Sequence, residues 1–181
     1  MTTRYFGAPV LRNEDNKLLS GRAQFIDDIE LTGMLHAAFV RSTYAHARIR
    51  GIDRTAALQR EGVIAIYTAH DLGDYWQPGP LLVPPPPVKD SVFNERTQVP
   101  LAKDKVRHVG EPIAIVIARN RYLAEDAAGE VIVDYEPLPA VVDLERALQP
   151  GSAHVHDDLG SNISAYVRQT KGNYASIVGK A

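Results

Sequence analysis

The side chains best suited to binding a metal stand close together near the end of this chain. They are His154, His156, Asp157 and Asp158. Two histidines separated by one residue project from the same side of an extended strand, and imidazole and carboxylate groups are ligands that zinc and iron accept. A closed metal site needs further ligands and supporting hydrogen bonds, and the neighbouring sequence offers none. The pattern therefore favours a polar loop after Gly151, with a metal hydrolase that uses His154 and His156 as the minor alternative.

A second group with chemical potential is a set of acidic residues in a predicted helix. Glu125, Asp126 and Glu130 are candidates for acid–base work, and residues 126 and 130 share a helix face. Acidic side chains in and near the first turn also stabilise a helix through its dipole, and we prefer that interpretation. Asp27 and Asp28 are interpreted in the same way, as a solvated turn or cap.

No other pattern assembles a catalytic site. Gly110, Glu111 and Pro112 precede an apolar run instead of following one, so they do not form a phosphate-binding loop. Ser42 and His46 have helical spacing in a segment predicted to be extended, which argues against a nucleophile and base. We therefore assign no catalytic, cofactor-binding or metal-binding residue. Several charged residues are interpreted as structural ion pairs or subunit contacts: Arg12, Glu14, Asp15, Arg41 and Arg48.

Composition narrows the class of protein. The 181 residues suit one domain, and an apolar content of 45% supports an ordinary core. The net charge is −2 without a basic run, which disfavours a nucleic-acid partner. The chain has no cysteine, so it offers no thiolate for an iron–sulfur cluster. No apolar run approaches the roughly 20 residues of a membrane helix, and the start lacks a secretory pattern. We expect a cytoplasmic protein without membrane insertion.

Hydrophobic periodicity predicts short strands and helices in alternation. Strands are predicted over 35–40, 46–52, 63–67, 113–118 and 131–135, with 63–67 and 113–118 buried because they are wholly apolar. Each predicted helix begins beside a capping residue: 54–60 at Asp53, 69–72 in a Thr68–Asp71 capping box, 121–129 at Asn120, and 144–148 at Asp143. Leu123, Ala127 and Ala128 are expected to face the core. The fold class is α+β, with short helices on a mixed sheet.

The remaining segments are predicted to be irregular. Residues 1–34 form an extended arm or a few short strands, and residues 151–181 are polar and loose. Residues 73–98 form a long surface loop, with a proline-rich part at 77–89 that excludes regular hydrogen bonding. A proline-rich ligand for a recognition domain is the alternative interpretation of this loop.

Several motifs in fixed order resemble a known family. They are RNED (12–15), LLSG (18–21), FIDDI (25–29), GMLHAAFVRS (33–42), AHARIR (45–50), PLAKDKVRHVGEPI (100–113), AEDAA (124–128) and VDYEPLPAVVD (133–143). Together they make residues 10–165 resemble the N-terminal a/b hammerhead domain of the molybdenum-binding large subunit in the xanthine dehydrogenase, aldehyde oxidase and aerobic carbon monoxide dehydrogenase family.

The resemblance implies a structural role in an oxidoreductase complex that hydroxylates a carbon centre or oxidises carbon monoxide. Residues 1–165 would form the hammerhead domain, and residues 166–181 a tail toward cofactor domains that the family places later in the chain. The implied cofactors of the complex are molybdopterin cytosine dinucleotide, [2Fe–2S] clusters and FAD. The implied partners are a molybdenum-cofactor polypeptide, an iron–sulfur small subunit and an FAD medium subunit. The family's catalytic residues lie in the later domains, so none is carried over here. The alternative is a stand-alone interaction or assembly module without catalysis.

Overall fold

The computed structural model describes residues 7, 9–80, 88, 91–173 and 178–179. The chain divides into two compact units, Met1–Met34 and Leu35–Ala181, and each is described by itself.

The first unit contains two short helical turns. They are α1, Asp15–Leu19, and the 3-10 turn η1, Ile26–Asp28. Arg12 Nε donates to Asp15 Oδ1 at 2.9 Å, which confirms an ion pair at these residues. The Asp28 carboxylate accepts a hydrogen bond from the Phe25 N–H at 2.9 Å, so Asp28 is a cap as expected. The prediction of short strands is wrong for the described part of this unit, because local turns satisfy its backbone groups instead.

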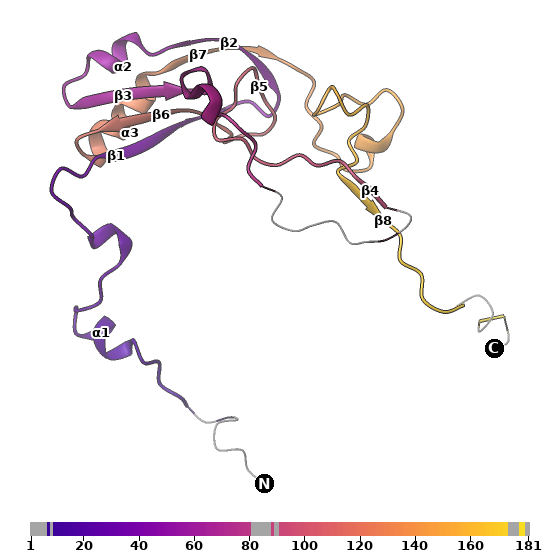
Figure 1. The fold of residues 1–181 in the computed structure, drawn as a ribbon, viewed down its shortest axis with the longest axis horizontal. Helices are drawn as coiled ribbons and strands as arrows, with labels where there is room; N and C mark the ends of the chain where they lie inside the picture. The colour runs from indigo at the N-terminus through magenta and orange to yellow at the C-terminus, as the bar shows by residue number, and fades with distance from the viewer. Residues whose placement is uncertain (1–6, 8, 81–87, 89–90, 174–177, 180–181) are drawn as a thin grey trace. The chain divides into compact units, whose positions relative to one another are not determined.

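The second unit is built on a three-stranded antiparallel sheet (Figure 1). Its strands are β1, His36–Arg41, β6, Pro112–Ala118, and β3, Val63–Thr68, in the order β1-β6-β3. Helix α3, Arg121–Glu130, lies against β1 and β6, and helix α2, Thr55–Gln59, lies against β3. Between sheet and helices is a cluster of buried side chains that includes Val40, Ile66, Ala114, Val116 and Ala127.

The face of this sheet away from the helices is apolar but not buried. Side chains alternate along a strand, so Phe39 and Tyr67 point to the side opposite Val40 and Ile66. Phe39 is 44% exposed and Tyr67 is 45% exposed. The prediction that 63–67 is a buried strand is therefore wrong for one face. For β6 the prediction holds better, because it is the central strand, yet Ile115 and Ile117 are only half-buried.

Two smaller sheets complete the second unit. Strands β5, Lys105–Val106, β2, Ala47–Asp53, and β7, Ile132–Pro137, are ordered β5-β2-β7. Strand β4, Ser91–Phe93, pairs with β8, Ala165–Val167. The α+β class is confirmed. The sheet is not mixed, since every strand pair of the described residues is antiparallel: β6 inserts between β1 and β3 with its direction reversed.

Strands β4 and β8 correct two predictions of irregular structure. β4 lies within 73–98 and β8 within 151–181. Each has only three residues, and each finds its partner far along the chain, so no local periodicity marks them. The proline run 84–87, and with it the predicted polyproline segment, lies outside the described residues.

Asn120 is the N-cap of α3 as predicted, and its Oδ1 atom accepts from the Leu123 N–H at 2.9 Å. The N-cap of α2 is Arg54 and not Asp53, although Asp53 Oδ1 accepts from the Thr55 N–H at 2.9 Å. Asp143 accepts from the N–H groups of Glu145 and Arg146, although the turn that follows is the short 3-10 segment η3, Arg146–Leu148, and not a helix over 144–148.

Two further details of the helices differ from the predictions. The segment after Thr68 is a 3-10 helix, η2, Ala69–Tyr75, longer than predicted and kinked at Gly73. In α3, Ala124 and Ala127 are the buried residues, while Leu123 and Ala128 are half-buried. Within the described ranges, no helix is both long and apolar enough to cross a membrane.

Candidate functional site

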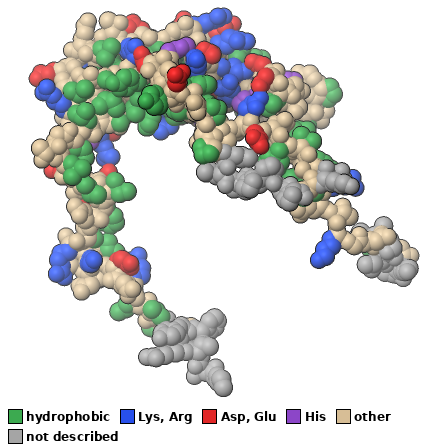
Figure 2. Space-filling view, in the orientation of Figure 1, with side chains coloured by type: hydrophobic (Ala, Val, Ile, Leu, Met, Phe, Trp, Pro, Cys, Tyr) green, Lys and Arg blue, Asp and Glu red, His purple; other side chains and the backbone are tan. Residues whose placement is uncertain are grey.

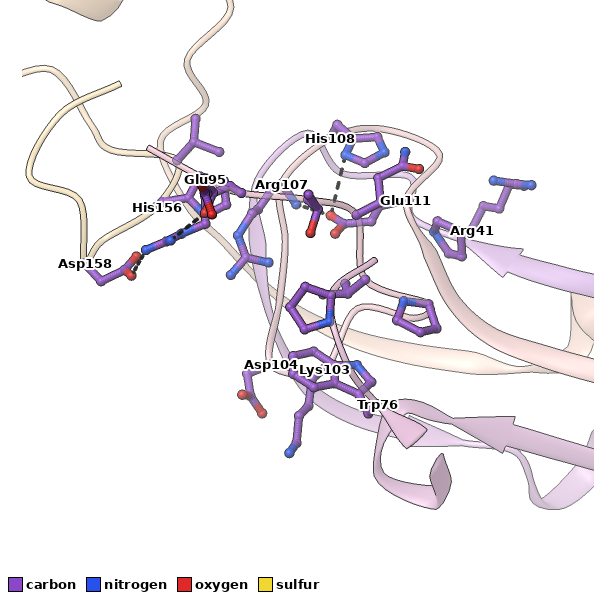
Figure 3. Close-up of a pocket in the computed structure, with 18 of the residues that line it drawn as sticks. Arg41, Trp76, Glu95, Lys103, Asp104, Arg107, His108, Glu111, His156 and Asp158 are labelled. Carbon is purple, nitrogen blue, oxygen red and sulfur yellow. Dashed lines mark hydrogen bonds and ion pairs between the residues drawn. The ribbon is translucent and has the colours of Figure 1, made fainter. Parts of the chain in front are cut away.

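A cavity of about 750 Å³ opens beside the end of β1 (Figure 3). Its walls come from five segments: β1, the turn after η2, residues 95–104, the connection between β5 and β6, and residues 155–158. The side chains labelled in Figure 3 are mostly charged. The lining of the cavity includes four cations, Arg41, Arg96, Lys103 and Arg107, and four carboxylates, Glu95, Asp104, Glu111 and Asp158.

The turn between β5 and β6 forms one wall through backbone contacts to β1. Gly110 has φ +85°, a conformation that glycine adopts without strain. Its N–H donates to the Ser42 carbonyl at 2.8 Å, and the Ser42 N–H donates to the Glu111 carbonyl at 2.9 Å. Arg41 Nη1 also donates to the Gly110 carbonyl, at 2.9 Å. The Gly110–Pro112 segment therefore positions this wall.

Glu111 is a buried carboxylate at the base of this turn. Its residue is only 7% exposed, and its Oε2 atom accepts from the Arg107 N–H. His108 Nδ1 lies 3.7 Å from the same oxygen. Burying a carboxylate without partners is costly, so these contacts account for its position. The carboxylate stabilises the turn and does not project into the cavity as an unpaired acid.

Arg107 places positive charge inside the cavity. Its Nη1 atom donates only to the Lys105 carbonyl, at 3.2 Å, and its buried Nε atom has no hydrogen-bond partner in the described part of the chain. Burial, followed by the charges of Arg107 and Arg96, lowers the pKa of His156. His156 is therefore predominantly neutral at pH 7, beside cations that disfavour its protonated form.

The two aspartates of the His154–Asp158 segment are both engaged in ion pairs. Lys105 Nζ donates to Asp157 at 2.9 Å, and this bond lowers the pKa of Asp157. Arg96 pairs with Asp158. Residues 154–156 do not form the strand that would align the two imidazoles. Among the described residues no group of three or more potential ligands lies close enough to hold a metal ion. The geometry thus favours the polar-loop interpretation.

Two of the acidic residues of α3, Asp126 and Glu130, share one cation. Arg60 Nη2 lies 3.4 Å from Asp126, and Arg60 Nη1 lies 2.5 Å from Glu130. This confirms that residues 126 and 130 occupy one face. Glu125 lies 4.0 Å from Arg121 on the same helix. Asp126 and Glu130 therefore connect α3 to the end of α2, which is a structural role.

Ser42 and His46 do not contact each other. Ser42 Oγ donates to the Tyr44 carbonyl at 2.8 Å, and His46 Nδ1 lies 2.7 Å from the Pro139 carbonyl. The sequence did not reveal the Arg54–Asp71 pair, in which two hydrogen bonds of 2.6 and 3.0 Å join the start of α2 to η2. The local signal is the capping box of Thr68 and Asp71, which gives no indication of the arginine that stands 17 positions before Asp71.

Comparison with known proteins relates the chain to one family. Residues 20–139 match the family model described as aldehyde oxidase and xanthine dehydrogenase, a/b hammerhead domain. The nicotine 6-hydroxylase large subunit of Paenarthrobacter nicotinovorans is 39% identical over 155 residues, covering 83% of this chain and 18% of its own. The carbon monoxide dehydrogenase large chain of Afipia carboxidovorans is 40% identical over 153 residues, which cover 84% of this chain and 18% of that relative.

The fold is also found in solved structures. The crystal structure of quinoline 2-oxidoreductase from Pseudomonas putida 86 superposes with a TM-score of 0.75 and 42% sequence identity, covering 86% of this chain and 19% of that chain. The sequence and structure matches agree in extent. The chain spans slightly less than a fifth of the length of these relatives.

Proposed function

Because this chain belongs to the aldehyde oxidase and xanthine dehydrogenase family through its a/b hammerhead domain, we propose that it acts as a structural part of a molybdenum hydroxylase large subunit. Its relatives are large subunits of such oxidoreductases. The proposed role is to support the molybdenum-cofactor domains and to contact iron–sulfur and flavin subunits. The observation that carries the proposal is the match over residues 20–139, together with the shared fold.

The donor set of this chain supports a non-catalytic role. An iron–sulfur cluster needs cysteine thiolates, and the sequence contains none. Three charged groups of the cavity, those of Arg96, Glu111 and Asp158, are engaged in ion pairs or in contacts to the backbone. We propose that molybdopterin cytosine dinucleotide, the [2Fe–2S] clusters and FAD of the complex are held by other polypeptide. No step of the reaction is assigned to a residue of this chain.

The domain boundaries and the location are also part of the proposal. Residues 1–165 form the hammerhead domain, and residues 166–181 lead toward the cofactor domains. The complex acts in the cytoplasm. The metal-hydrolase alternative has no supporting geometry, since Asp157 and Asp158 are paired with Lys105 and Arg96.

A pull-down from the native host tests this function. The tagged chain is purified, its partners are identified by mass spectrometry, and molybdenum, iron and flavin are measured. We expect a molybdenum-domain polypeptide, an iron–sulfur polypeptide and a flavin polypeptide in defined ratio. Recovery of the chain alone, without metal or flavin, would contradict the proposal and leave the stand-alone interaction module as the better description.

A further inference from the structure

The cavity beside β1 has on its wall an arginine that no carboxylate neutralises. Arg107 directly follows β5 and lines the cavity. The ion pairs among the described residues do not include its guanidinium. Its Nη1 atom donates only to the Lys105 carbonyl, and its buried Nε atom has no acceptor in the described part of the chain. A buried donor without an acceptor is costly, so this guanidinium has unused capacity to bind an anion.

The surroundings of Arg107 carry a surplus of positive charge. The neighbouring His156 imidazole responds to it: burial lowers the pKa of His156, and the charges of Arg107, Arg96 and Lys105 lower it further. The one charge that raises this pKa is that of Asp158. Figure 2 shows Lys and Arg side chains gathered, with a few acidic ones between them, over the region where β2 and β5 lie in Figure 1. A negative group placed beside His156 therefore enters a favourable field.

The carboxylates nearest to this field already have other partners. Asp158 is paired with Arg96, and Asp157 with Lys105. Each of these pairs cancels its own charge, so Arg107 is the cation that remains.

Three further carboxylates line the cavity without neutralising Arg107. Glu111 is buried, but it accepts from the backbone N–H of Arg107 and not from the guanidinium. Glu95 and Asp104 are exposed residues at the edge of the cavity, where water and salt screen their charge.

The donors on this wall suit an oxyanion. A guanidinium presents parallel N–H groups whose spacing matches two oxygens of a carboxylate or phosphate. The neutral imidazole of His156 supplies one more N–H donor. Figure 3 shows Arg107 and His156 at neighbouring positions on one side of the cavity. A volume of about 750 Å³ is in the range of small-molecule sites.

We propose that Arg107 and His156 form a binding site for the oxyanion group of a small molecule, a phosphate or a carboxylate. A small rotation of the Arg107 side chain turns its Nε–Nη edge toward the anion and gives the buried N–H an acceptor. The imidazole of His156 donates to a further oxygen. This site goes beyond the proposed function and does not depend on it, because the native-host pull-down and anion binding to the chain are separate measurements.

The test is a titration of the full chain with inorganic phosphate, and separately with acetate, at pH 7 and constant ionic strength. Nuclear magnetic resonance follows the backbone N–H signals of residues 105–111 and 155–158 and yields the dissociation constant. Arg107→Gln and His156→Leu remove the two proposed donors. Arg119→Gln is the matched control, since Arg119 is an exposed arginine outside the cavity. Asp158→Asn removes the carboxylate that opposes an anion beside His156.

We expect the wild-type chain and Arg119→Gln to bind one of the anions or both with a dissociation constant of the order of 1 mM. Arg107→Gln should bind at least roughly tenfold more weakly, and His156→Leu roughly threefold more weakly, because a charged donor contributes more than a neutral one. Asp158→Asn should bind roughly threefold more tightly, because a nearby negative charge is removed. A damaged fold could not produce that gain.

The two anions distinguish the sources of the oxyanion. Saturation by phosphate alone would support the site and assign it to phosphate-bearing molecules. Saturation by acetate alone would support it and assign it to carboxylates, and saturation by both would support a site that reads only the shared oxyanion chemistry.

Several results would overturn the proposal. They are equal dissociation constants for Arg107→Gln and Arg119→Gln, weaker binding by Asp158→Asn, and the absence of saturable binding by the wild-type chain up to about 50 mM of either anion. Unchanged binding by His156→Leu would overturn the role of that imidazole. Circular dichroism verifies that each variant is folded. If Arg107→Gln is not, Arg107→Lys takes its place and should also bind more weakly than the wild-type chain, since an ammonium cannot make two parallel hydrogen bonds.

Discussion

Asp71 shows how one carboxylate can join three elements. It accepts hydrogen bonds from Arg54 and from both the N–H and the hydroxyl of Thr68. Arg54 also donates to the Ile66 carbonyl at 2.5 Å, so the same network reaches the middle of β3. The hydrogen bond from Arg54, supported by those from Thr68, holds the pKa of Asp71 far below its ordinary value. A carboxylate that is ionised at pH 7 thus ties α2, β3 and η2 together.

Replacing Asp71 with asparagine should destabilise the fold in a pH-dependent way. A depressed pKa in the folded state stabilises the protein above the unfolded-state pKa of about 4, and this contribution disappears as the pH falls through the folded pKa. We expect Asp71→Asn to lower the free energy of unfolding by about 2 kcal/mol at pH 7, allowing for partial solvent exposure of the pair. Urea unfolding at pH 7 and at pH 3 measures the difference, which should shrink at the lower pH.

Asp74→Asn is the matched control for this residue. Asp74 belongs to the same 3-10 helix and is exposed, and the same loss of charge there should change stability by less than about 0.5 kcal/mol. If Asp71→Asn lowered the free energy of unfolding equally at pH 3 and at pH 7, the effect would come from the altered hydrogen bonding and packing of the side chain and not from its charge.

At the scale of the element, the connection between α2 and β3 depends on Gly62. Its φ is +85°, and its carbonyl accepts from the Arg119 N–H at 2.9 Å, which joins this turn to the one between β6 and α3. A Cβ atom at Gly62 would lie 2.6 Å from Leu123 Cδ1. The glycine therefore permits both the backbone conformation and the close approach of α3.

Gly62→Ala should destabilise the protein by about 1–2 kcal/mol, since a left-handed conformation is strained for alanine and the Leu123 side chain must move. Gly129→Ala provides a control of opposite sign. Gly129 lies inside α3 with open space around its Cα, so alanine there should stabilise by about 0.5–1 kcal/mol. Thermal and urea unfolding give the change in the free energy of unfolding for both variants. Equal changes at the two positions would show that Gly62 is not required for the turn between α2 and β3.

The elements themselves were largely predictable, whereas their pairing was not. Alternation and capping residues predicted β1, β2, β3, β6, β7 and the start of α3, because those signals are local. The order β1-β6-β3 depends on which strand fills the space between two others, and no local pattern contains that information. The exposure of Phe39 and Tyr67 was missed for the same reason: wholly apolar sequence predicts burial, and only the absence of a covering element exposes these side chains.

The candidate site was less predictable than the fold. The histidines and aspartates at 154–158 were visible in the sequence, but their partners Lys105 and Arg96 come from distant segments. Whether these aspartates are metal ligands or members of ion pairs therefore depends on contacts that only the folded chain creates. The family resemblance, by contrast, was readable from motifs alone, since it depends on residues in order along the chain and not on contacts.

For the whole molecule, two apolar layers share residues. Ile52 and Val133 pack against both buried clusters, so the β1-β6-β3 sheet and the β5-β2-β7 sheet form one body within the Leu35–Ala181 unit.

The purified chain, free of partners, should carry neither molybdenum nor pterin at unit ratio. This expectation follows from the proposed function, which assigns the molybdenum cofactor to other polypeptide. Elemental analysis and fluorescence of oxidised pterin measure both, with the complex from the native host as the positive control. Molybdenum and pterin bound tightly at one per chain would show that this chain holds the cofactor.

The antiparallel pairing of β1 with β6 has a consequence for biosynthesis. His36 of β1 pairs with Ala118 of β6, so the ribosome must complete most of the domain before β1 has a neighbour. At about 5–20 residues per second this wait lasts several seconds, during which an apolar strand is exposed with both edges unpaired. Non-local pairing of this kind also slows folding once the chain is complete. The nascent chain should therefore be a frequent client of ribosome-associated chaperones, and its yield should fall more steeply than that of a helical protein of equal length when those chaperones are depleted.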